Sequence, residues 1–368
     1  MHEPDGAGPV RPRSRGRVVG AIAGSVALVG SLVAGTLFLS GRHGGGQVAA
    51  APVIPTTTTV PATTVTTVAT TVATSPPPAP PRPAARRPRA ATVSAASARA
   101  TAARAQYRGL GTWADVYDWT AAFTNGNPRF GPADVDAMAA QGVQTLYIQA
   151  AQATSADPVL EPRRLLPIVA RAHQRGLRVV AWYLPDLTDV SADLAHLTAI
   201  SRLAVDGVAV DIESRAVGDV ATRNARLVDL SRALRAALPG RPIGAIVLPP
   251  TLTEVINPAY WPGFPWRSIA PLYDVWLPMA YWSFRSVSSN YRDGYRYTAD
   301  SVIRLRNDLG QPGALVHPIG GIADQVSAAD ALRFVGAARA TGCLGASLYD
   351  WRTTAGAVWP AMRTARAK

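Results

Sequence analysis

Two carboxylic acids stand two residues apart at the end of a short apolar segment. Residues 206–213 read Asp-Gly-Val-Ala-Val-Asp-Ile-Glu, which predicts a strand whose side chains alternate between its two faces. Asp211 and Glu213 then share one face, and the aliphatic residues beside them occupy the other. Buried carboxylates are unfavourable unless they have partners or a chemical task. In α/β folds such tasks concentrate at the carboxyl ends of strands, so this pair predicts general acid–base chemistry.

Eight apolar segments rich in Val, Ile, Leu and Tyr follow residue 107, and each predicts a strand. They cover residues 109–113, 143–149, 177–184, 207–212, 243–248, 275–281, 314–319 and 344–349. Amphipathic stretches between them predict helices at 132–140, 161–175, 220–238 and 299–309. Ser327 opens another helix, with Asp330 at capping-box spacing. A Pro- and Trp-rich loop at 249–271 replaces the fifth helix.

Eight such units within residues 107–368 predict an α/β fold, a (β/α)₈ TIM barrel. An open, doubly wound sheet is the alternative architecture. It is disfavoured because no Gly-rich phosphate loop follows the first strand.

Aromatic and acidic side chains stand at the carboxyl ends of the predicted strands. In a barrel these ends form one rim. Aromatic rings and acids together suit a sugar, which has apolar ring faces and hydroxyl edges. The residues expected to contact substrate are Trp113, Gln149, Trp182, Tyr183, Trp282, Asp350 and Trp351. His317 on the seventh strand is expected either to pack in the core or to line the site.

Glutamate is scarce in the barrel body. Residues 107–368 contain only Glu161, Glu213 and Glu254, and only Glu213 ends a predicted strand. Many retaining glycosidases use two carboxylates about 5 Å apart, one as acid and one as nucleophile. A single Glu preceded by an Asp fits substrate-assisted cleavage better, because the acetamide oxygen of the substrate is then the nucleophile. The alternative is a hydrolase of non-acetylated sugars, whose second carboxylate would be Asp324, Asp350 or Asp115.

In its motifs the chain resembles the chitinase-like glycoside hydrolases of family 18. The fourth strand of that family reads Asp-Gly-x-Asp-x-Asp-x-Glu, and its sixth strand carries Met-x-Tyr-Asp. The first motif is matched at Asp206, Gly207, Asp211 and Glu213, and the second is matched in part at Met279 and Tyr281.

The resemblance implies a role for each matched residue. Glu213 would be the general acid, Asp211 would orient the acetamide group, and Tyr281 would hydrogen-bond to the acetamide oxygen. Met279 would line the substrate site, and Trp351 would be the tryptophan that the family has near its eighth strand. The implied enzyme is a glycoside hydrolase for a β-linked, N-acetylated polysaccharide.

The chain departs from these motifs in several places. Ala209 replaces the middle Asp of the first motif, so the mutual pKa-raising effect of two neighbouring acids is lost. Trp282 replaces the Asp after Tyr281, and Ala-Trp-Tyr-Leu-Pro stands where the third strand of the family has Ser-x-Gly-Gly. Pro278 inside the sixth predicted strand indicates a bulge. The loss at Ala209 favours a second hypothesis, a carbohydrate-binding barrel without turnover.

Structural roles compete with chemistry for the acids of the fourth strand. Asp211 and Glu213 could form a buried ion pair with an arginine of the body, such as Arg178, Arg285 or Arg292. Asp206 is expected to cap the turn before the strand.

The first 106 residues differ in composition from the rest. Four arginines lie within residues 1–17, and residues 18–40 contain no charge over 23 positions, which is long enough to cross a bilayer of about 30 Å as a helix. We expect a cytoplasmic basic N-terminus, a transmembrane signal anchor and an extracytoplasmic body. A cleaved signal peptide, with secretion, is the alternative. Residues 41–106, rich in Thr, Pro and Ala, predict a disordered linker.

Charge and cysteine content limit the partners. Residues 1–106 hold eleven Arg against two acids, so most of the formal net charge of +13 lies outside the barrel body, and nothing supports nucleic-acid binding. The single cysteine, Cys343, excludes an intrachain disulfide and a multi-cysteine zinc site. We expect neither metal nor cofactor. The expected partners are a polysaccharide, with cell-wall glycan as one candidate, and the membrane through residues 18–40.

Overall fold

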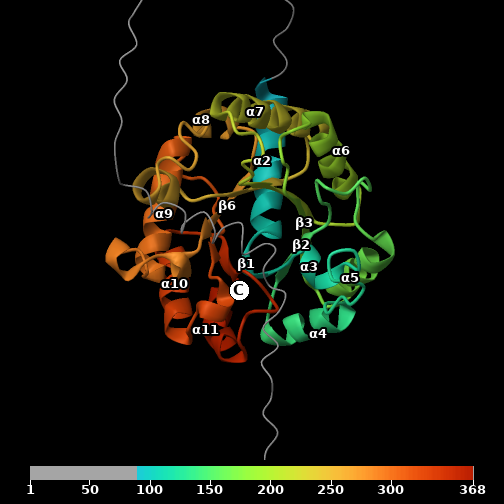
Figure 1. Cartoon of the computed structure of the whole chain (residues 1–368), viewed down its shortest axis with the longest axis vertical. Helices are drawn as coiled ribbons and strands as arrows, with labels where there is room; N and C mark the ends of the chain where they lie inside the picture. Colours follow the sequence, from blue (N-terminus) through green and yellow to red (C-terminus); the bar gives the residue numbers. More distant parts are fainter. Residues whose placement is uncertain (1–88, 368) are drawn as a thin grey trace, which may run out of the picture. The chain divides into compact units, whose positions relative to one another are not determined.

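The predicted barrel is present. The structure, a computed structural model, describes residues 89–367, and eight parallel strands close into a barrel in chain order (Figure 1). The strands are β1 (Gly109–Ala114), β2 (Thr145–Gln149), β3 (Arg178–Tyr183), β4 (Gly207–Ile212), β5 (Ile243–Val247), β6 (Val275–Ala280), β7 (Ile319–Gly320) and β8 (Gly345–Leu348). Closure is made where Gly109 of β1 lies opposite Gly345 of β8. A side chain at Gly345 would overlap the backbone of β1, so this contact requires glycine.

The helices surround the barrel, except for α2, which is seen over its centre (Figure 1). They are α2 (Arg89–Gln106), α3 (Val116–Trp119), α4 (Pro132–Gln141), α5 (Pro162–Gln174), α6 (Val190–Ser201), α7 (Val220–Ala237), α8 (Trp266–Ile269), α9 (Gly294–Leu309), α10 (Ala328–Ala340) and α11 (Trp359–Met362). Short 3₁₀ turns lie at Trp282–Phe284, Val287–Ser289, Ala323–Gln325, Gly356–Val358 and Arg363–Ala365. The capping box predicted at Ser327 is present, since its side chain accepts from the Asp330 N–H.

The fifth and seventh units are the irregular parts of the barrel. As predicted, no long helix follows β5; a π-type turn, Thr251–Ile256, and the single-turn α8 stand there. The seventh strand was predicted over residues 314–319 but covers only Ile319–Gly320, with an isolated pairing of Val316 and Trp276. Pro318 interrupts this segment, and because proline has no N–H it cannot donate to a ladder.

The linker prediction is wrong at its carboxyl end. Residues 89–106 form α2, and Arg99 of this helix makes an ion pair with Asp274 at 3.2 Å. Contacts with the barrel therefore order a segment whose composition alone did not predict a packed helix. Residues 1–88, which include the predicted basic terminus, anchor and most of the linker, lie outside the described residues. Within residues 89–367 no helix is long and apolar enough to cross a membrane.

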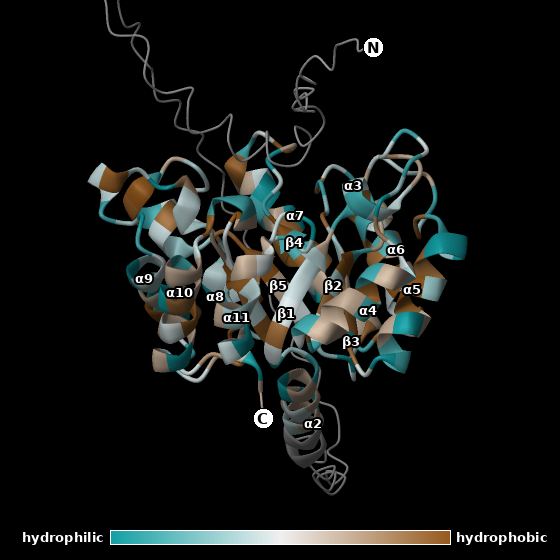
Figure 2. Ribbon diagram, turned by 90° about the horizontal axis from the view of Figure 1, so that it is seen from below, coloured by the Kyte–Doolittle hydropathy of each residue, from teal (hydrophilic) through white to brown (hydrophobic). Residues whose placement is uncertain are grey.

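Tyr107 follows α2 and fills the interior of the barrel at the amino-terminal ends of the strands. Its hydroxyl donates to the Val208 carbonyl at 2.8 Å. A Cβ at Gly207 would lie 2.8 Å from that hydroxyl, and one at Gly244 would lie 3.0 Å from the ring. These two strand glycines therefore make room for the tyrosine. In Figure 2, α2 projects from one end of the barrel, whereas α3, which follows β1, lies at the other end.

Candidate active site

Asp211 and Glu213 lie at the carboxyl end of β4, on the face that points into the barrel. The interior position of this face is shown by Ala209, whose Cβ would lie 3.2 Å from a Cβ built on Gly244. Asp211 is buried, and its Oδ1 has no hydrogen-bond partner among the described residues. Glu213 is half-buried. The predicted alternation along this strand is therefore confirmed, and the two acids form a pair that we call the acid pair.

Burial changes the proton affinity of both members. Burial and then the Glu213 charge raise the pKa of Asp211 well above its ordinary value. Burial raises the pKa of Glu213 from 4.5 to about 7. Two acids this close titrate as a unit, so the acid pair retains a proton near neutral pH. It can therefore give a proton to a leaving group and take one back from water.

The acid pair does not form the ion pair that was the structural alternative. Arg178 donates to the Thr145 hydroxyl at 3.1 Å. Arg285 and Arg292 donate to backbone carbonyl groups, at 3.4 and 3.3 Å. These three arginines thus have other partners, and the burial of the acid pair is not explained by them.

Tyr281 follows β6 and lies close to the acid pair. Burial raises the pKa of the Tyr281 hydroxyl well above its ordinary value, and the charges of Glu213 and Asp211 raise it further. The hydroxyl, on which the charges of both acids act, therefore keeps its proton at neutral pH and can donate a hydrogen bond. Met279, two residues earlier on the strand, is buried in the same interior. The three predicted catalytic residues therefore gather in one place.

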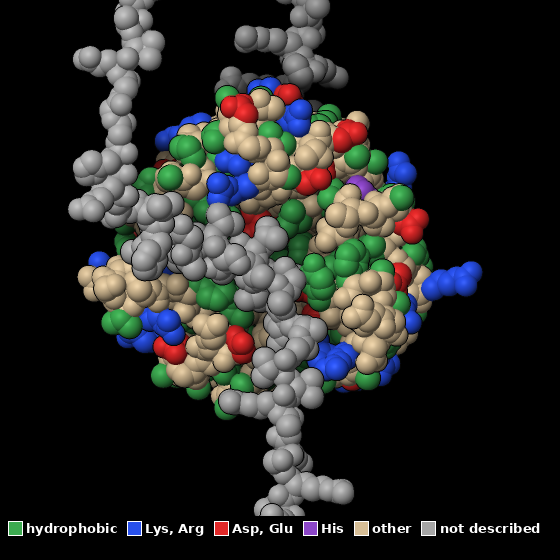
Figure 3. Space-filling view, in the orientation of Figure 1, with side chains coloured by type: hydrophobic (Ala, Val, Ile, Leu, Met, Phe, Trp, Pro, Cys, Tyr) green, Lys and Arg blue, Asp and Glu red, His purple; other side chains and the backbone are tan. Residues whose placement is uncertain are grey.

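Two of the predicted aromatic residues lie inside the barrel. Trp113 stacks on Tyr147 with ring centroids 4.4 Å apart, and its Nε1 donates to the Ser347 hydroxyl at 2.9 Å. It is 1% exposed, so it packs below the rim and does not offer a platform. Trp182 meets Trp113 edge-on at 5.9 Å, and its buried Nε1 has no partner in the described part of the chain. Trp182 therefore keeps a donor for a ligand. Seen down the barrel, hydrophobic side chains gather near the centre of the visible face (Figure 3).

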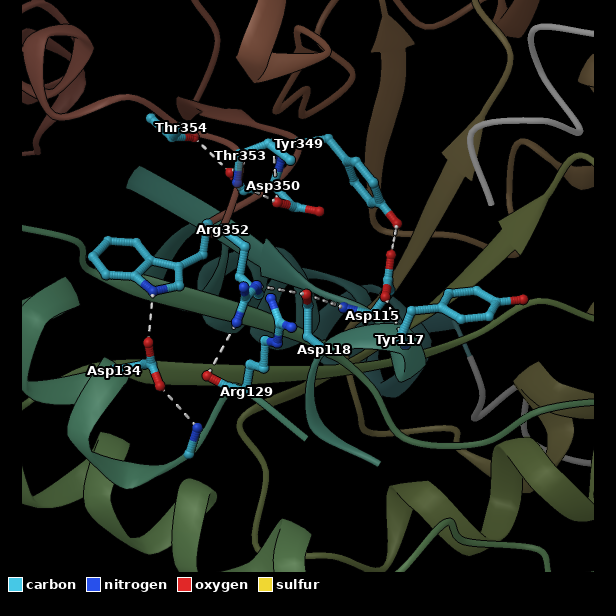
Figure 4. Close-up of polar contacts among 12 residues, drawn as sticks. Asp115, Tyr117, Asp118, Arg129, Asp134, Tyr349, Asp350, Arg352, Thr353 and Thr354 are labelled. Carbon is cyan, nitrogen blue, oxygen red and sulfur yellow. Dashed lines mark hydrogen bonds and ion pairs between the residues drawn. The ribbon is translucent and has the colours of Figure 1, made fainter. Parts of the chain in front are cut away.

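A second acidic group, Asp115, Asp118 and Asp350, lies at the ends of β1 and β8 (Figure 4). Their carboxylate oxygens lie within 4.8 Å of one another, and all three residues are buried. Burial raises the pKa of Asp115 to about 6. Burial, followed by the charges of Asp115 and Asp350, raises the pKa of Asp118 to about 8. The oxygen ligands would suit a hard cation such as Ca²⁺ or Mg²⁺.

Each acid of this group already has bonding partners, however. Asp115 accepts from the Tyr349 hydroxyl at 2.7 Å and from the Tyr117 N–H at 2.8 Å, which caps α3. Asp118 makes an ion pair with Arg352 at 3.5 Å. Asp350, predicted to bind substrate, accepts from the Thr353 N–H and hydroxyl. These bonds hold the loops after β1 and β8 together.

Two residues predicted to contact substrate, Tyr183 and Trp282, pack against helices outside the barrel instead of lying beside the acid pair. The Tyr183 hydroxyl donates to Asp193 of α6 at 2.6 Å. Trp282 packs against Phe334 of α10, with ring centroids 5.0 Å apart. Each residue follows an inward-facing one, Trp182 or Tyr281, so alternation sends it to the outer layer.

Two further predicted contacts serve the loops of the rim. Gln149 accepts from the Val116 N–H at 3.3 Å and so positions α3. The Trp351 indole N–H donates to Asp134 of α4 at 3.2 Å, and the ring lies 5.1 Å from Trp359. Trp351 is therefore part of the packing between helices α4 and α11.

Three other residues singled out in the sequence, His317, Asp206 and Asp324, lie away from the acid pair. His317 is fully buried, and its Nδ1 lies 2.7 Å from the Tyr107 carbonyl at the amino-terminal end of the barrel, so it packs in the core. Asp206 accepts from the Val179 N–H at 2.7 Å, a structural role as predicted. Asp324 is exposed, on a 3₁₀ turn after β7.

Three side chains near the acid pair were not among the predicted site residues. The Tyr349 ring lies 6.2 Å from the Tyr281 ring, and its place at the end of the eighth strand was the available signal. Arg215 lies 4.9 Å over the Tyr260 ring. Arg215 is two residues after Glu213, but Tyr260 lies in the loop after β5, where the sequence offers no period from which to place a side chain.

Comparison of the sequence with family models gives no match, and no curated protein matches it in sequence. Solved structures do match in fold. A class V chitinase from Pseudomonas fluorescens Pf-5 superposes with a TM-score of 0.51 at 10% identity, over 70% of this chain and 99% of that one. The C-terminal domain of a putative chitinase from Desulfitobacterium hafniense DCB-2 gives the same values.

The spore cortex-lytic enzyme SleL from Bacillus cereus also has a TM-score of 0.51 at 10% identity, over 71% of this chain and 74% of that one. At such low identity the likeness concerns the fold. It confirms, at that level, the resemblance to chitinase-like glycoside hydrolases that the motifs of the fourth and sixth strands indicate: the chain has the closed (β/α)₈ barrel of these proteins.

Proposed function

We propose that the protein is a glycoside hydrolase for a β-linked, N-acetylated polysaccharide and that it acts by substrate-assisted cleavage. The observation that carries the proposal is the acid pair at the end of β4. Asp211 is buried and Glu213 half-buried, neither has an ion-pair partner among residues 89–367, and the pKa of Glu213 is raised to about 7. A structural acid would have partners, as the group on β1 and β8 has. A general acid needs a pKa near the working pH.

In the proposed reaction Glu213 protonates the glycosidic oxygen. The acetamide oxygen of the substrate attacks the anomeric carbon, and the Glu213 carboxylate then activates the water that opens the cyclic intermediate. Asp211, whose pKa is raised by burial and by the Glu213 charge, orients the acetamide group. The Tyr281 hydroxyl, held neutral, donates to the acetamide oxygen. The unpartnered Trp182 indole N–H is a further donor toward the bound sugar.

The proposed enzyme is extracytoplasmic and tethered to the membrane, with a cell-wall glycan as its substrate. The uncharged residues 18–40 support this part of the proposal, because they are long enough to serve as a membrane anchor. Secretion after cleavage of a signal peptide is the alternative.

A carbohydrate-binding barrel without turnover is the second candidate, and the position of Ala209 favours it. Ala209 is fully buried beside Gly244, so no acid precedes Asp211 on this face to share its proton. Binding would then persist while the proton transfer that Glu213 requires would be slow.

Sugar release by the full chain separates these functions. Chitooligosaccharides, peptidoglycan and non-acetylated β-glucans would be incubated with the wild type and with Glu213→Gln. We expect release from N-acetylated glycans alone, reduced by about 10²–10⁴-fold in Glu213→Gln. Glu254→Gln is the matched control, since that residue pairs with Arg304 of α9, outside the barrel interior. Binding without release in the wild type would mean a lectin. Release from plain β-glucans only would mean a two-carboxylate enzyme.

A further inference from the structure

Two arginines border the acid pair without using a carboxylate as partner. Arg223 stands in the first turn of α7 and is 2% exposed, and its guanidinium lies 4.2 Å over the Trp261 ring. Arg215, in the loop before α7, lies over Tyr260. No carboxylate of residues 89–367 is within ion-pair distance of either group. Two neighbouring aromatic residues of the β5–α8 loop thus hold two positive charges.

The buried guanidinium of Arg223 is incompletely bonded. It donates to the Val217 carbonyl at 3.3 Å, and its Nε has no partner among the described residues. Asp219, the N-cap of α7, uses its carboxylate to accept from the Thr222 N–H at 2.8 Å. Stacking on tryptophan stabilises a cation by about 0.5–2 kcal/mol. This gain only partly offsets the free-energy cost of removing a charge from water without a counter-ion.

The two guanidinium groups are neighbours, because they lie over the rings of two consecutive residues, Tyr260 and Trp261. Burial lowers the pKa of Arg223, and the charge of Arg215 lowers it further. Like charges brought together repel unless an anion lies between them. The N-terminus of α7, an 18-residue helix, adds its positive dipole end to the same place. The two guanidinium groups and the helix N-terminus therefore form a positively charged region suited to an anion.

Tyr260 connects this basic group to the site of the proposed chemistry. Burial raises the pKa of its hydroxyl, the Glu213 charge raises it further, and the charges of Arg215 and Arg223 lower it. Arg215, whose guanidinium lies 4.9 Å over the Tyr260 ring, follows Glu213 by only two residues. An anion held by Arg215 would therefore lie beside the site of the proposed chemistry.

We propose that Arg215 and Arg223 form an anion subsite that binds a carboxylate carried by the glycan, beside the sugar that is cleaved. The proposal rests on the proposed function and narrows its substrate class to N-acetylated glycans with carboxylate substituents. Guanidinium is suited to this ligand, because its planar donors match the two carboxylate oxygens. The carboxylate could belong to a lactyl ether on the sugar or to a uronic acid, and the test separates these sources.

The test measures binding by isothermal titration calorimetry with the full chain carrying Glu213→Gln, so that turnover does not interfere. The probes are peptide-free glycan strands that contain N-acetylmuramic acid, the same strands with their carboxyl groups reduced to alcohols, hyaluronan oligosaccharides, and neutral chitopentaose. Arg215→Gln and Arg223→Gln are added singly and together. Arg215 is exposed, so its substitution leaves the core intact. Arg232→Gln, on the exposed side of α7, is the matched control.

We expect a carboxylated glycan to bind about tenfold or more tightly than the reduced strands or chitopentaose. Arg215→Gln should reduce that preference, the double variant should abolish it, and Arg232→Gln should preserve it. A preference for the muramic acid strands assigns the carboxylate to the lactyl ether, and one for hyaluronan assigns it to the uronate. Equal affinity for carboxylated and reduced strands, or a preference that survives the double variant, would overturn the proposal. Release of sugar from chitopentaose by the wild type would still support the proposed function in that event.

Discussion

Removing the Glu213 carboxyl should stabilise the folded protein, and by more as the pH rises. The substitution is Glu213→Gln, which keeps the size of the side chain and removes its charge. In the folded protein burial raises the pKa of this group from 4.5 to about 7. The folded state therefore binds the proton more tightly than the unfolded chain does, so wild-type stability falls as the pH rises through this window and stays low above it.

The size of the effect follows from the two pKa values. Their difference corresponds to a loss of about 3 kcal/mol of wild-type stability when Glu213 is fully ionised. Roughly 1 kcal/mol of this loss is already present at pH 5, because the carboxyl group of the unfolded chain is then mostly ionised. Partial exposure of Glu213 screens part of the remainder. We expect the stability gain of Glu213→Gln over the wild type to be larger at pH 8 than at pH 5 by about 1–2.5 kcal/mol.

Urea unfolding of the full chain, followed by tryptophan fluorescence at pH 5 and pH 8, measures this difference. Asp229→Asn is the control, because it removes a carboxyl of α7 that is 66% exposed and should give the same change at both pH values. A gain from Glu213→Gln that is equal at pH 5 and pH 8 would refute the reasoning. Glu213 would then be hydrated in the folded protein, and its assignment as a general acid tuned by burial would lose its physical basis.

Three more predictions concern the parts of the barrel around the site. Tyr349→Phe keeps the ring but leaves the buried Asp115 without its 2.7 Å donor, so the free energy of unfolding should fall by about 1–3 kcal/mol in urea titrations at pH 8. Burial lowers the pKa of His317 from 6.5 to about 4. The contribution of this residue to the free energy of unfolding is therefore fully present above pH 6.5 and is lost as the pH falls toward 4. His317→Asn should remove up to about 3 kcal/mol of the decrease in the free energy of unfolding between pH 7 and pH 4. Asp274→Asn weakens the ion pairs with Arg235 at 2.5 Å and with α2; it should cost about 2–4 kcal/mol in thermal unfolding and speed amide exchange in α2.

The sequence predicted most reliably what depends on local periodicity. The alternation of side chains placed Asp211 and Tyr281 inside the barrel, and turn chemistry identified the capping box at Ser327. Tyr183 and Trp282 were also predicted to contact substrate, although neighbouring residues of a strand face opposite sides. Each follows an inward-facing residue and therefore faces a helix.

What the sequence left undetermined depends on contacts between distant segments. Composition alone gave no reason for residues 89–106 to pack, because the helix is held by Asp274, which is 175 residues away from Arg99. Likewise, the partners of Asp115 and Asp350 come from loops on different strands, so their structural bonds could not be distinguished from free carboxylates. Tyr260 was missed for the same reason. It lies in a long loop, where side-chain directions do not repeat regularly and so cannot be predicted from sequence spacing.

The contrast between the two acidic groups makes Asp115 a poor candidate for the nucleophile of a two-carboxylate mechanism. A carboxylate nucleophile needs an oxygen that is free to attack the anomeric carbon, but both oxygens of Asp115 accept hydrogen bonds, one from Tyr349 and one from the N–H that caps α3. Using Asp115 in this way would break the bonds that join the ends of β1 and β8. Asp211 has an unbonded oxygen but lies beside Glu213 on the same strand, so the two cannot flank a glycosidic bond from opposite sides. The proposed substrate-assisted reaction needs no second carboxylate as nucleophile, because the acetamide group of the substrate attacks the anomeric carbon.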